Sequence, residues 1–186
     1  VNGKWYIFYH RGFGNSNMQR KVCAEAISID EEGNIGQVTM TNHGFAGPLS
    51  PYERIEAAYA THVGMEGFKP GCYLDEYRMD LHPLVHITDG NCVEYKDFDF
   101  GVQKGELAVI LEICQMAGGV LKILLDSPEG KEAGTVSIES GSGKDWIHVR
   151  EGITDITGVH TIYLRFESRM EKEICRLAAF WFEKIS

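Results

Sequence analysis

Short runs of β-branched and aromatic residues, rather than long amphipathic stretches, dominate the hydrophobic pattern of this 186-residue chain. They alternate with Gly, Asn and Asp turns, and this pattern is typical of an all-β sandwich, barrel or propeller. One segment, MEKEICRLAAFWF near 170–182, fits a helix or a turn followed by a strand. The pattern predicts strands at 5–10, 23–29, 35–41, 54–60, 93–98, 107–114, 119–126, 134–138, 146–150, 159–166 and 176–184.

The run 159–166 shows the alternation of a half-buried strand most clearly. Successive side chains of a strand point to opposite faces. One face carries His160, Ile162, Leu164 and Phe166, and the other carries Val159, Thr161, Tyr163 and Arg165. The first face is mostly apolar, so we expect it to line the core.

Charge and turn residues both indicate a boundary near residue 51. Residues 1–51 carry four basic and four acidic side chains, while the rest of the chain has 14 basic and 23 acidic ones and supplies the whole net charge of −9. The segment GFAGPLSPYER at 44–54 is rich in Gly, Pro and Ser, as linkers are. We therefore predict a first region at 1–47, a linker at 48–53 and a sandwich domain at 54–186.

Composition excludes several classes of protein. A binder of nucleic acid normally has a basic face, which a chain of net charge −9 does not suggest. No apolar run approaches the roughly 18 residues that span a membrane. The opening VNGKWYIFYH lacks a secretory signal, so we expect either that a signal was removed or that the chain continues a longer polypeptide.

The five cysteines are odd in number and form no CxxC pair, which argues against a zinc ribbon and against a dense disulfide framework. Buried thiols are the expected state, and one bridge, for example Cys72 to Cys92, remains open if the protein is secreted. His82 and His86 are four residues apart, but Pro83 disfavours a helix there, so a two-histidine metal site is not expected.

Residues 1–47 resemble the last blade of the five-bladed propeller of glycoside hydrolase family 43. In that family a strand close to WYLFYHR precedes a strand with the pattern R…AE…F…DG.I..V..T..G. The matching residues are Trp5, Tyr6, Phe8, Tyr9, His10, Arg11, Arg20, Ala24, Glu25, Asp30, Gly33, Val38, Thr41 and Gly44. The resemblance implies that these strands pair with propeller strands of the same polypeptide, which this chain does not contain.

The same resemblance places His10 near the central channel of the propeller, where a metal ion is often held; an ordinary core histidine is the alternative. Glycosidic hydrolysis needs two positioned carboxyl groups. The family's catalytic acids sit on earlier blades, and no residue here matches them, so we expect no catalytic residue in this chain.

Residues 52–186 resemble a family 6 carbohydrate-binding module, a jelly-roll β-sandwich. The segments that carry the resemblance are RIEAAYA (54–60), VHITDGNCVEYKDFDFG (85–101), GGVLKILLDSPEGKEAGTVSI (118–138), DWIHV (145–149), GVHTIYLRFES (158–168) and AAFWFEKI (178–185). Together the two regions imply an all-β chain: a few propeller strands followed by a jelly-roll sandwich. Such modules often follow family 43 catalytic domains.

The family binds sugar at the loop edge of the sandwich, through an aromatic before the I..GDY strand, a Trp near W.TW and the Asn of FN.DWF. Here Tyr73, Tyr77 and His82 are the candidates for the first aromatic, and Trp146 is the remaining Trp, at the spacing of the inner one. Ala178 replaces the Asn. A second family site, on the concave face, loses its aromatic to Cys92, and Asn91 replaces the Asp before it. A weakened, shifted or absent sugar site is the alternative.

The family's structural calcium site uses the second Glu of IEAE and the Asp of FN.DWF. Here these positions are Ala58 and Phe180, and Glu56 alone is insufficient, because Ca²⁺ needs several oxygen ligands. We therefore expect neither calcium nor another cofactor.

The resemblances favour a module that targets a glycoside hydrolase to plant polysaccharide such as arabinoxylan. The alternative is a purely structural sandwich of a xylosidase or arabinofuranosidase with a degenerate sugar site. The expected partners are a polysaccharide or oligosaccharide and the catalytic propeller of the same polypeptide, with neither nucleic acid nor membrane. We expect the parent enzyme to be extracellular or periplasmic, with a cytoplasmic location left open.

Overall fold

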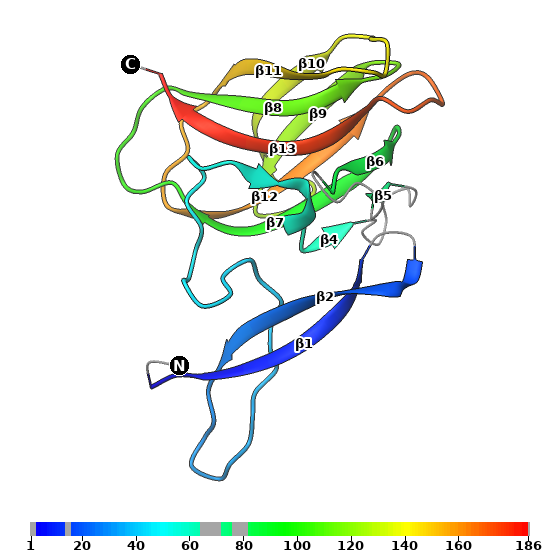
Figure 1. Cartoon of the computed structure of the whole chain (residues 1–186). Helices are drawn as coiled ribbons and strands as arrows, with labels where there is room; N and C mark the ends of the chain where they lie inside the picture. The colour runs from blue at the N-terminus through cyan, green and yellow to red at the C-terminus, as the bar shows by residue number, and fades with distance from the viewer. Residues whose placement is uncertain (1–2, 14–15, 64–71, 76–81, 186) are drawn as a thin grey trace.

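Two packed antiparallel sheets form a β-sandwich, and a β-hairpin lies beside it (Figure 1). The computed structural model describes residues 3–13, 16–63, 72–75 and 82–185, with the backbone alone for 11–13 and 16–21. The five-stranded sheet, ordered β10-β9-β12-β7-β4, contains β4 (His62–Val63), β7 (Cys92–Asp99), β9 (Gly119–Leu125), β10 (Lys131–Ile138) and β12 (Val159–Glu167). No helix in these ranges has the length and apolar character needed to cross a membrane.

The six-stranded sheet is ordered β11-β8-β13-β6-β5, and β3 also pairs with β13. It contains β3 (Ile55–Glu56), β5 (Tyr73–Leu74), β6 (Leu84–Ile87), β8 (Leu107–Gln115), β11 (Trp146–Ile153) and β13 (Cys175–Lys184). A 3₁₀ turn, Ala57–Tyr59, follows β3. The all-β jelly-roll sandwich expected from the sequence is thus confirmed.

The core lies between the two sheets and is rich in aromatic rings. Phe180 stands edge-on to Tyr95 with ring centroids 4.8 Å apart, and Phe182 stands edge-on to Phe100 at 5.1 Å. Aromatic pairs in this geometry add roughly 0.5–1.5 kcal/mol beyond the burial of their area. Of the β12 face predicted to be buried, Ile162, Leu164 and Phe166 do line the core. His160 does not, because the register shifts between His160 and Ile162 and its ring bonds to Asp126 and Thr157 instead.

Several predicted elements differ from the structure. The segment 35–41 is not a strand: Ile35 forms a single bridge with Ile29, and Thr41 donates its N–H to the Glu25 side chain instead of to a neighbouring strand. The strand predicted at 54–60 shrinks to β3 and the 3₁₀ turn. The short strands β4, β5 and β6 were missed, and the segment near 170–182 contributes to β13.

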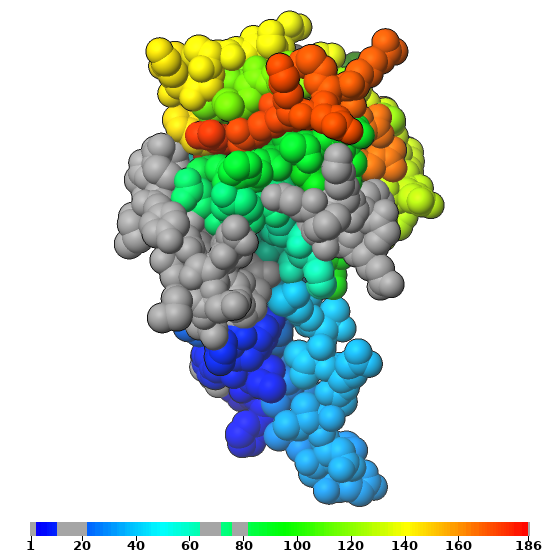
Figure 2. All heavy atoms as spheres, turned by 90° about the vertical axis from the view of Figure 1, so that its right-hand side faces the viewer, coloured from blue at the N-terminus to red at the C-terminus, as the bar shows by residue number. Residues whose placement is uncertain are grey.

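The first region is a long hairpin of β1 (Trp5–Phe13) and β2 (Ser16–Ile27), which projects from the sandwich (Figures 1 and 2). Trp5, Phe8 and Val22 are 66%, 62% and 75% exposed. His10 is exposed as well, so it is not a core histidine in this chain. A two-stranded hairpin is at best marginally stable alone. Packing of further protein surface against its exposed apolar side chains would therefore stabilise it.

The segment after the hairpin holds the first region against the sandwich. Buried Glu25 accepts hydrogen bonds from the Thr41 N–H at 2.8 Å and the Thr41 hydroxyl at 2.6 Å. The next residue, Asn42, accepts the N–H of Lys96 in β7 at 2.7 Å and donates to the carbonyl of Tyr59. The chain from hairpin to sandwich is thus tied down by polar contacts.

Residues 48–53, predicted as a linker, pack along the sandwich. Leu49 forms a parallel bridge with Phe98, and the Pro51 carbonyl accepts the N–H of Phe182 at 2.9 Å. The Tyr52 hydroxyl donates to the carbonyl of Phe100 at 3.0 Å. The division into 1–47, 48–53 and 54–186 stays a prediction, but the segment between the two regions makes ordered contacts.

Candidate sugar-binding edge

A stacked pair of rings marks one edge of the six-stranded sheet. Tyr73 in β5 lies over His86 in β6, with ring centroids 5.0 Å apart and planes inclined by 22°. The backbone of His86 has a left-handed φ of 56°, which interrupts the regular strand, and its side chain is exposed. The stack offers flat aromatic surface beside a backbone irregularity, and irregularities of this kind gather at functional sites.

An ion pair adjoins this stack. The Glu173 carboxylate accepts the N–H of His86 at 2.8 Å and two bonds from the Arg176 guanidinium, at 3.1 and 3.4 Å. These bonds raise the pKa of Arg176 above its ordinary value, so the guanidinium stays charged. The edge thus combines aromatic rings with donors and acceptors that sugar hydroxyls could use.

Strand register places Trp146 on the same face, but far from Tyr73. Trp146 pairs with Cys114, and Cys114 pairs with Arg176. This row faces away from the core, because the adjacent residues Ile113 and Leu177 are core residues. Four strand spacings of about 4.8 Å separate β11 from β5, or about 19 Å in all. One pyranose ring therefore cannot be sandwiched between Trp146 and Tyr73.

The predicted site residues thus have different positions. Tyr73 and Arg176 share an outward face, and half-buried Trp146 lies farther along it. His82 precedes β6 with a φ of 42°, but the ring stacked on Tyr73 belongs to His86. Tyr77 lies outside the described residues. His86 was not among the predicted site residues, although its place directly before Ile87, at the start of the I..GDY pattern, was an available signal.

The concave-face position is closed. Cys92 is fully buried on the outer side of the five-stranded sheet, where it clusters with Leu124 and Tyr163. Burial raises the pKa of the Cys92 thiol to about 11. All five cysteines remain thiols. Cys92 thus offers no exposed surface on which a sugar ring could stack.

A buried carboxylate adjoins this cluster. Glu94, 5% exposed, accepts the hydroxyls of Tyr163 and Thr61, each at 2.8 Å, and Lys96 Nζ lies 3.8 Å away. Burial alone would raise the pKa of Glu94, but these hydrogen bonds and the Lys96 charge outweigh it and hold that pKa below its usual value. The carboxylate therefore serves as an internal polar anchor.

The residues at the family's calcium positions do not fit the ion. Ala58 is buried in the 3₁₀ turn, and Phe180 is fully buried against Tyr95. The Tyr95 hydroxyl donates to the carbonyl of Ala57 at 3.1 Å. Hard cations need several oxygen ligands, which apolar side chains cannot supply. The absence of calcium stays a prediction.

The chain is similar to several bacterial enzymes over most of its length. A xylosidase/arabinosidase of Thermoclostridium stercorarium is 27% identical over 183 residues, which cover 89% of this chain and 37% of the relative. An arabinoxylan arabinofuranohydrolase of Bacillus subtilis is 24% identical over 176 residues, covering 88% and 33%. The chain thus spans about a third of the length of these relatives.

Solved structures share the fold. A CBM6 module of Clostridium stercorarium, solved with cellobiose, has a TM-score of 0.61 at 23% identity and covers 75% of this chain and 98% of its own. A family 43 arabinoxylan arabinofuranohydrolase of Bacillus subtilis, solved with cellotetraose, has a TM-score of 0.64 at 19% identity and covers 99% of this chain and 39% of its own. The sequence model described as carbohydrate binding module (family 6) matches residues 76–184, well over half of the chain. The chain therefore belongs to the family 6 carbohydrate-binding modules.

Proposed function

We propose that the sandwich binds plant polysaccharide of the arabinoxylan type and so brings a family 43 glycoside hydrolase to its substrate. The observation that carries the proposal is the outward Tyr73–His86 stack beside the Glu173–Arg176 ion pair, in a chain of this family. The names of the relatives support the choice of polysaccharide, since two of them are called arabinoxylan arabinofuranohydrolase.

The edge has the chemistry that sugars require. The C–H faces of a pyranose pack on aromatic surface, and its hydroxyls donate to carboxylates and accept from guanidinium groups. Tyr73 and His86 supply the aromatic surface, and Arg176 and Glu173 supply the polar groups. The site is small, because Trp146 is too distant to close over the same ring. We therefore propose weak binding, in the millimolar range of roughly 4 kcal/mol.

The hairpin supports a second part of the proposal, that the catalytic propeller precedes the sandwich in the same polypeptide. The exposed apolar side chains of Trp5, Phe8 and Val22 provide surface for further propeller strands. Hydrolysis would then take place in the propeller, outside this chain, and the enzyme would act outside the cell, where plant polysaccharide is found.

A purely structural sandwich is the competing function. Buried Cys92 at the concave face and buried Ala178 at the family's Asn position favour it, because both remove groups that would touch sugar. The polar contacts of Asn42 also suit a sandwich that supports its neighbour. This reading predicts no affinity for any polysaccharide.

Isothermal titration calorimetry with xylo- and cello-oligosaccharides separates the two functions. We expect millimolar binding that weakens roughly tenfold in Tyr73→Ala, the loss of about 1.4 kcal/mol. Tyr59→Ala is the matched control, because Tyr59 is an exposed tyrosine elsewhere on the sandwich. Heats indistinguishable from dilution for the unmodified chain would support the structural function instead.

A further inference from the structure

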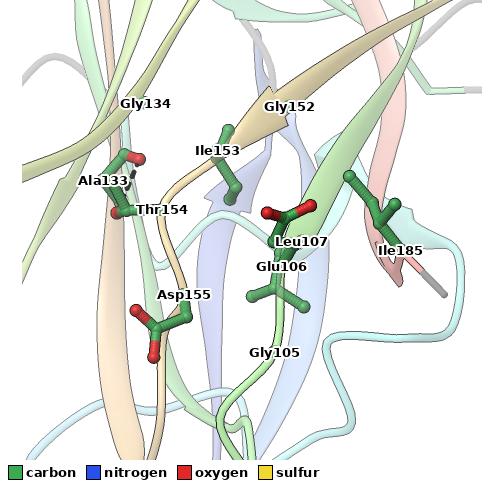
Figure 3. A pocket seen from close by; sticks show the side chains of 10 residues that line it. All are labelled: Gly105, Glu106, Leu107, Ala133, Gly134, Gly152, Ile153, Thr154, Asp155 and Ile185. Carbon is green, nitrogen blue, oxygen red and sulfur yellow. Dashed lines mark hydrogen bonds between the residues drawn. The ribbon is translucent and has the colours of Figure 1, made fainter.

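A cavity of about 670 Å³ opens at one end of the sandwich (Figure 3). Its volume lies within the roughly 300–1,000 Å³ of ordinary ligand sites. The cavity is remote from the Tyr73 edge. It is lined by Ile153 and Leu107, which pair at one end of β11 and β8, whereas Trp146 and Cys114 pair at the other end of these strands, in the row that continues to Arg176. The seven steps from Trp146 to Ile153 along β11 span about 23 Å, at about 3.3 Å per step.

The cavity has an apolar floor and an acidic rim. Leu107, Ile153 and Ile185 supply the floor. Glu106, just before β8, and Asp155, just after β11, bring exposed carboxylates to the rim (Figure 3). Neither carboxylate has a hydrogen-bond or ion-pair partner within the part of the chain that the structure describes, so both can accept from a ligand.

Two glycines keep the cavity open. A Cβ added at Gly105 or Gly152 would meet no atom within 4 Å, and neither residue has a left-handed backbone. Neither glycine is therefore required by packing or by backbone strain at its position. Side chains there would instead extend into open space at the cavity.

The chemistry of this cavity suits a neutral, hydroxyl-rich ligand. Ionised carboxylates only accept hydrogen bonds, and a carboxylate can accept from two neighbouring hydroxyls at once. The apolar floor can pack on the C–H groups of a sugar ring. An acidic sugar would be repelled by Glu106 and Asp155, because like charges disfavour each other.

We propose that this cavity is a second carbohydrate site, which accepts a neutral pyranose segment of the polysaccharide and discriminates against uronic-acid substituents. The proposal rests on the proposed function, since it assumes that the sandwich meets polysaccharide. Because the two sites lie far apart on the sandwich, one module could hold two stretches of polysaccharide chain.

Affinity electrophoresis in gels containing neutral xylan tests the cavity with the edge site as an internal reference. The variants are Tyr73→Ala, Gly152→Leu and the amide variant, which is Glu106→Gln with Asp155→Asn. Gly152→Leu and the amide variant are each also combined with Tyr73→Ala, and the mobility of every variant is compared with its mobility without xylan. Gly36→Leu is the matched control, because that glycine also has open space and no left-handed backbone. Thermal melts check that every variant folds.

We expect partial retardation for each single-site variant, none for Tyr73→Ala combined with Gly152→Leu, and at least tenfold weaker binding at the cavity when the carboxylates become amides. Glucuronic-acid-substituted xylan should retard the Tyr73→Ala variant less than neutral xylan. If Gly152→Leu and the amide variant leave the retardation of Tyr73→Ala unchanged, the cavity proposal is overturned and the edge site stands. If Tyr73→Ala has no effect and Gly152→Leu removes all retardation, the edge proposal fails and the cavity stands. If the unmodified chain is not retarded, both fail.

Discussion

Replacing Glu94 by Ala should destabilise the sandwich strongly. The carboxylate accepts two hydroxyl hydrogen bonds at 2.8 Å in a site where the residue is 5% exposed. Bonds to a charged group contribute about 1.5–3 kcal/mol each, and a buried group left without a partner costs about 1–3 kcal/mol. The Thr61 hydroxyl also donates to the backbone carbonyl of residue 94 at 3.0 Å, so this hydroxyl would keep an acceptor in the variant. The Tyr163 hydroxyl would lose its described partner.

We therefore expect a loss of about 3 kcal/mol in the free energy of unfolding. For a domain of this size about 1 kcal/mol corresponds to about 2–4 °C in Tm, which gives a fall of about 6–12 °C. Thermal unfolding followed by circular dichroism at pH 7 measures it. Glu183→Ala is the control, because the Glu183 side chain is 49% exposed and lies 3.5 Å from Arg150. Such surface pairs contribute about 0–1 kcal/mol.

The effect of Glu94 should also depend on pH. Its folded-state pKa is depressed, so its contribution is fully present above the unfolded value near 4.5 and is lost as pH falls through the lower folded value. The Tm difference between the unmodified chain and Glu94→Ala should therefore narrow below about pH 4.5. A Glu94→Ala variant within about 2 °C of the unmodified chain at pH 7 would refute the anchoring role.

Three further predictions concern other parts of the chain. Ca²⁺ or EDTA should leave Tm unchanged, because Ala58 and Phe180 supply no ligands; a shift of several degrees on chelation would contradict this. The chain alone should not hydrolyse aryl-xylosides or aryl-arabinosides, since no carboxyl pair matches the catalytic one; turnover abolished by a single Asp or Glu substitution in this chain would overturn that expectation. Asn42→Ala should weaken the contact between hairpin and sandwich, because it removes the hydrogen bond from the Lys96 N–H, and limited proteolysis of residues 28–50 should become faster. Asn34→Ala is the surface control. An unchanged cleavage rate in Asn42→Ala would argue that Asn42 does not hold the hairpin and the sandwich together.

The sequence was sufficient for the parts of the fold that rest on alternation. From Ile162 to Phe166 the core face of β12 followed from period-two patterning, and the family motifs predicted the jelly roll. The irregular register before Ile162, which takes His160 out of the core, did not follow. The sequence was not sufficient where hydrogen bonds to side chains take the place of backbone hydrogen bonds between strands. Residues 35–41 have strand-like composition, but Thr41 is held by Glu25, a contact between distant residues that no local pattern reveals.

The candidate site shows the same limit. Tyr73 was identified from its type and approximate position, while His86 was overlooked because its partner ring lies 13 residues away in the sequence and meets it through the β5–β6 pairing. The 19 Å between Tyr73 and Trp146 follows only from strand order, which the sequence did not specify. The cavity between Glu106 and Asp155 likewise depends on the β8–β11 register.

The most direct test of the account is the NMR mapping of oligosaccharide binding on the isotope-labelled chain. Titration with xylohexaose should shift the amides of His86, Glu173 and Arg176 and the ring signals of Tyr73, because the sugar would lie on that edge. The buried signals of Cys92 and Glu94 should stay in place. Shifts centred on Cys92 and Glu94 would contradict the account by showing that the concave face opens to bind sugar, and no shifts at all would show that the sandwich is structural.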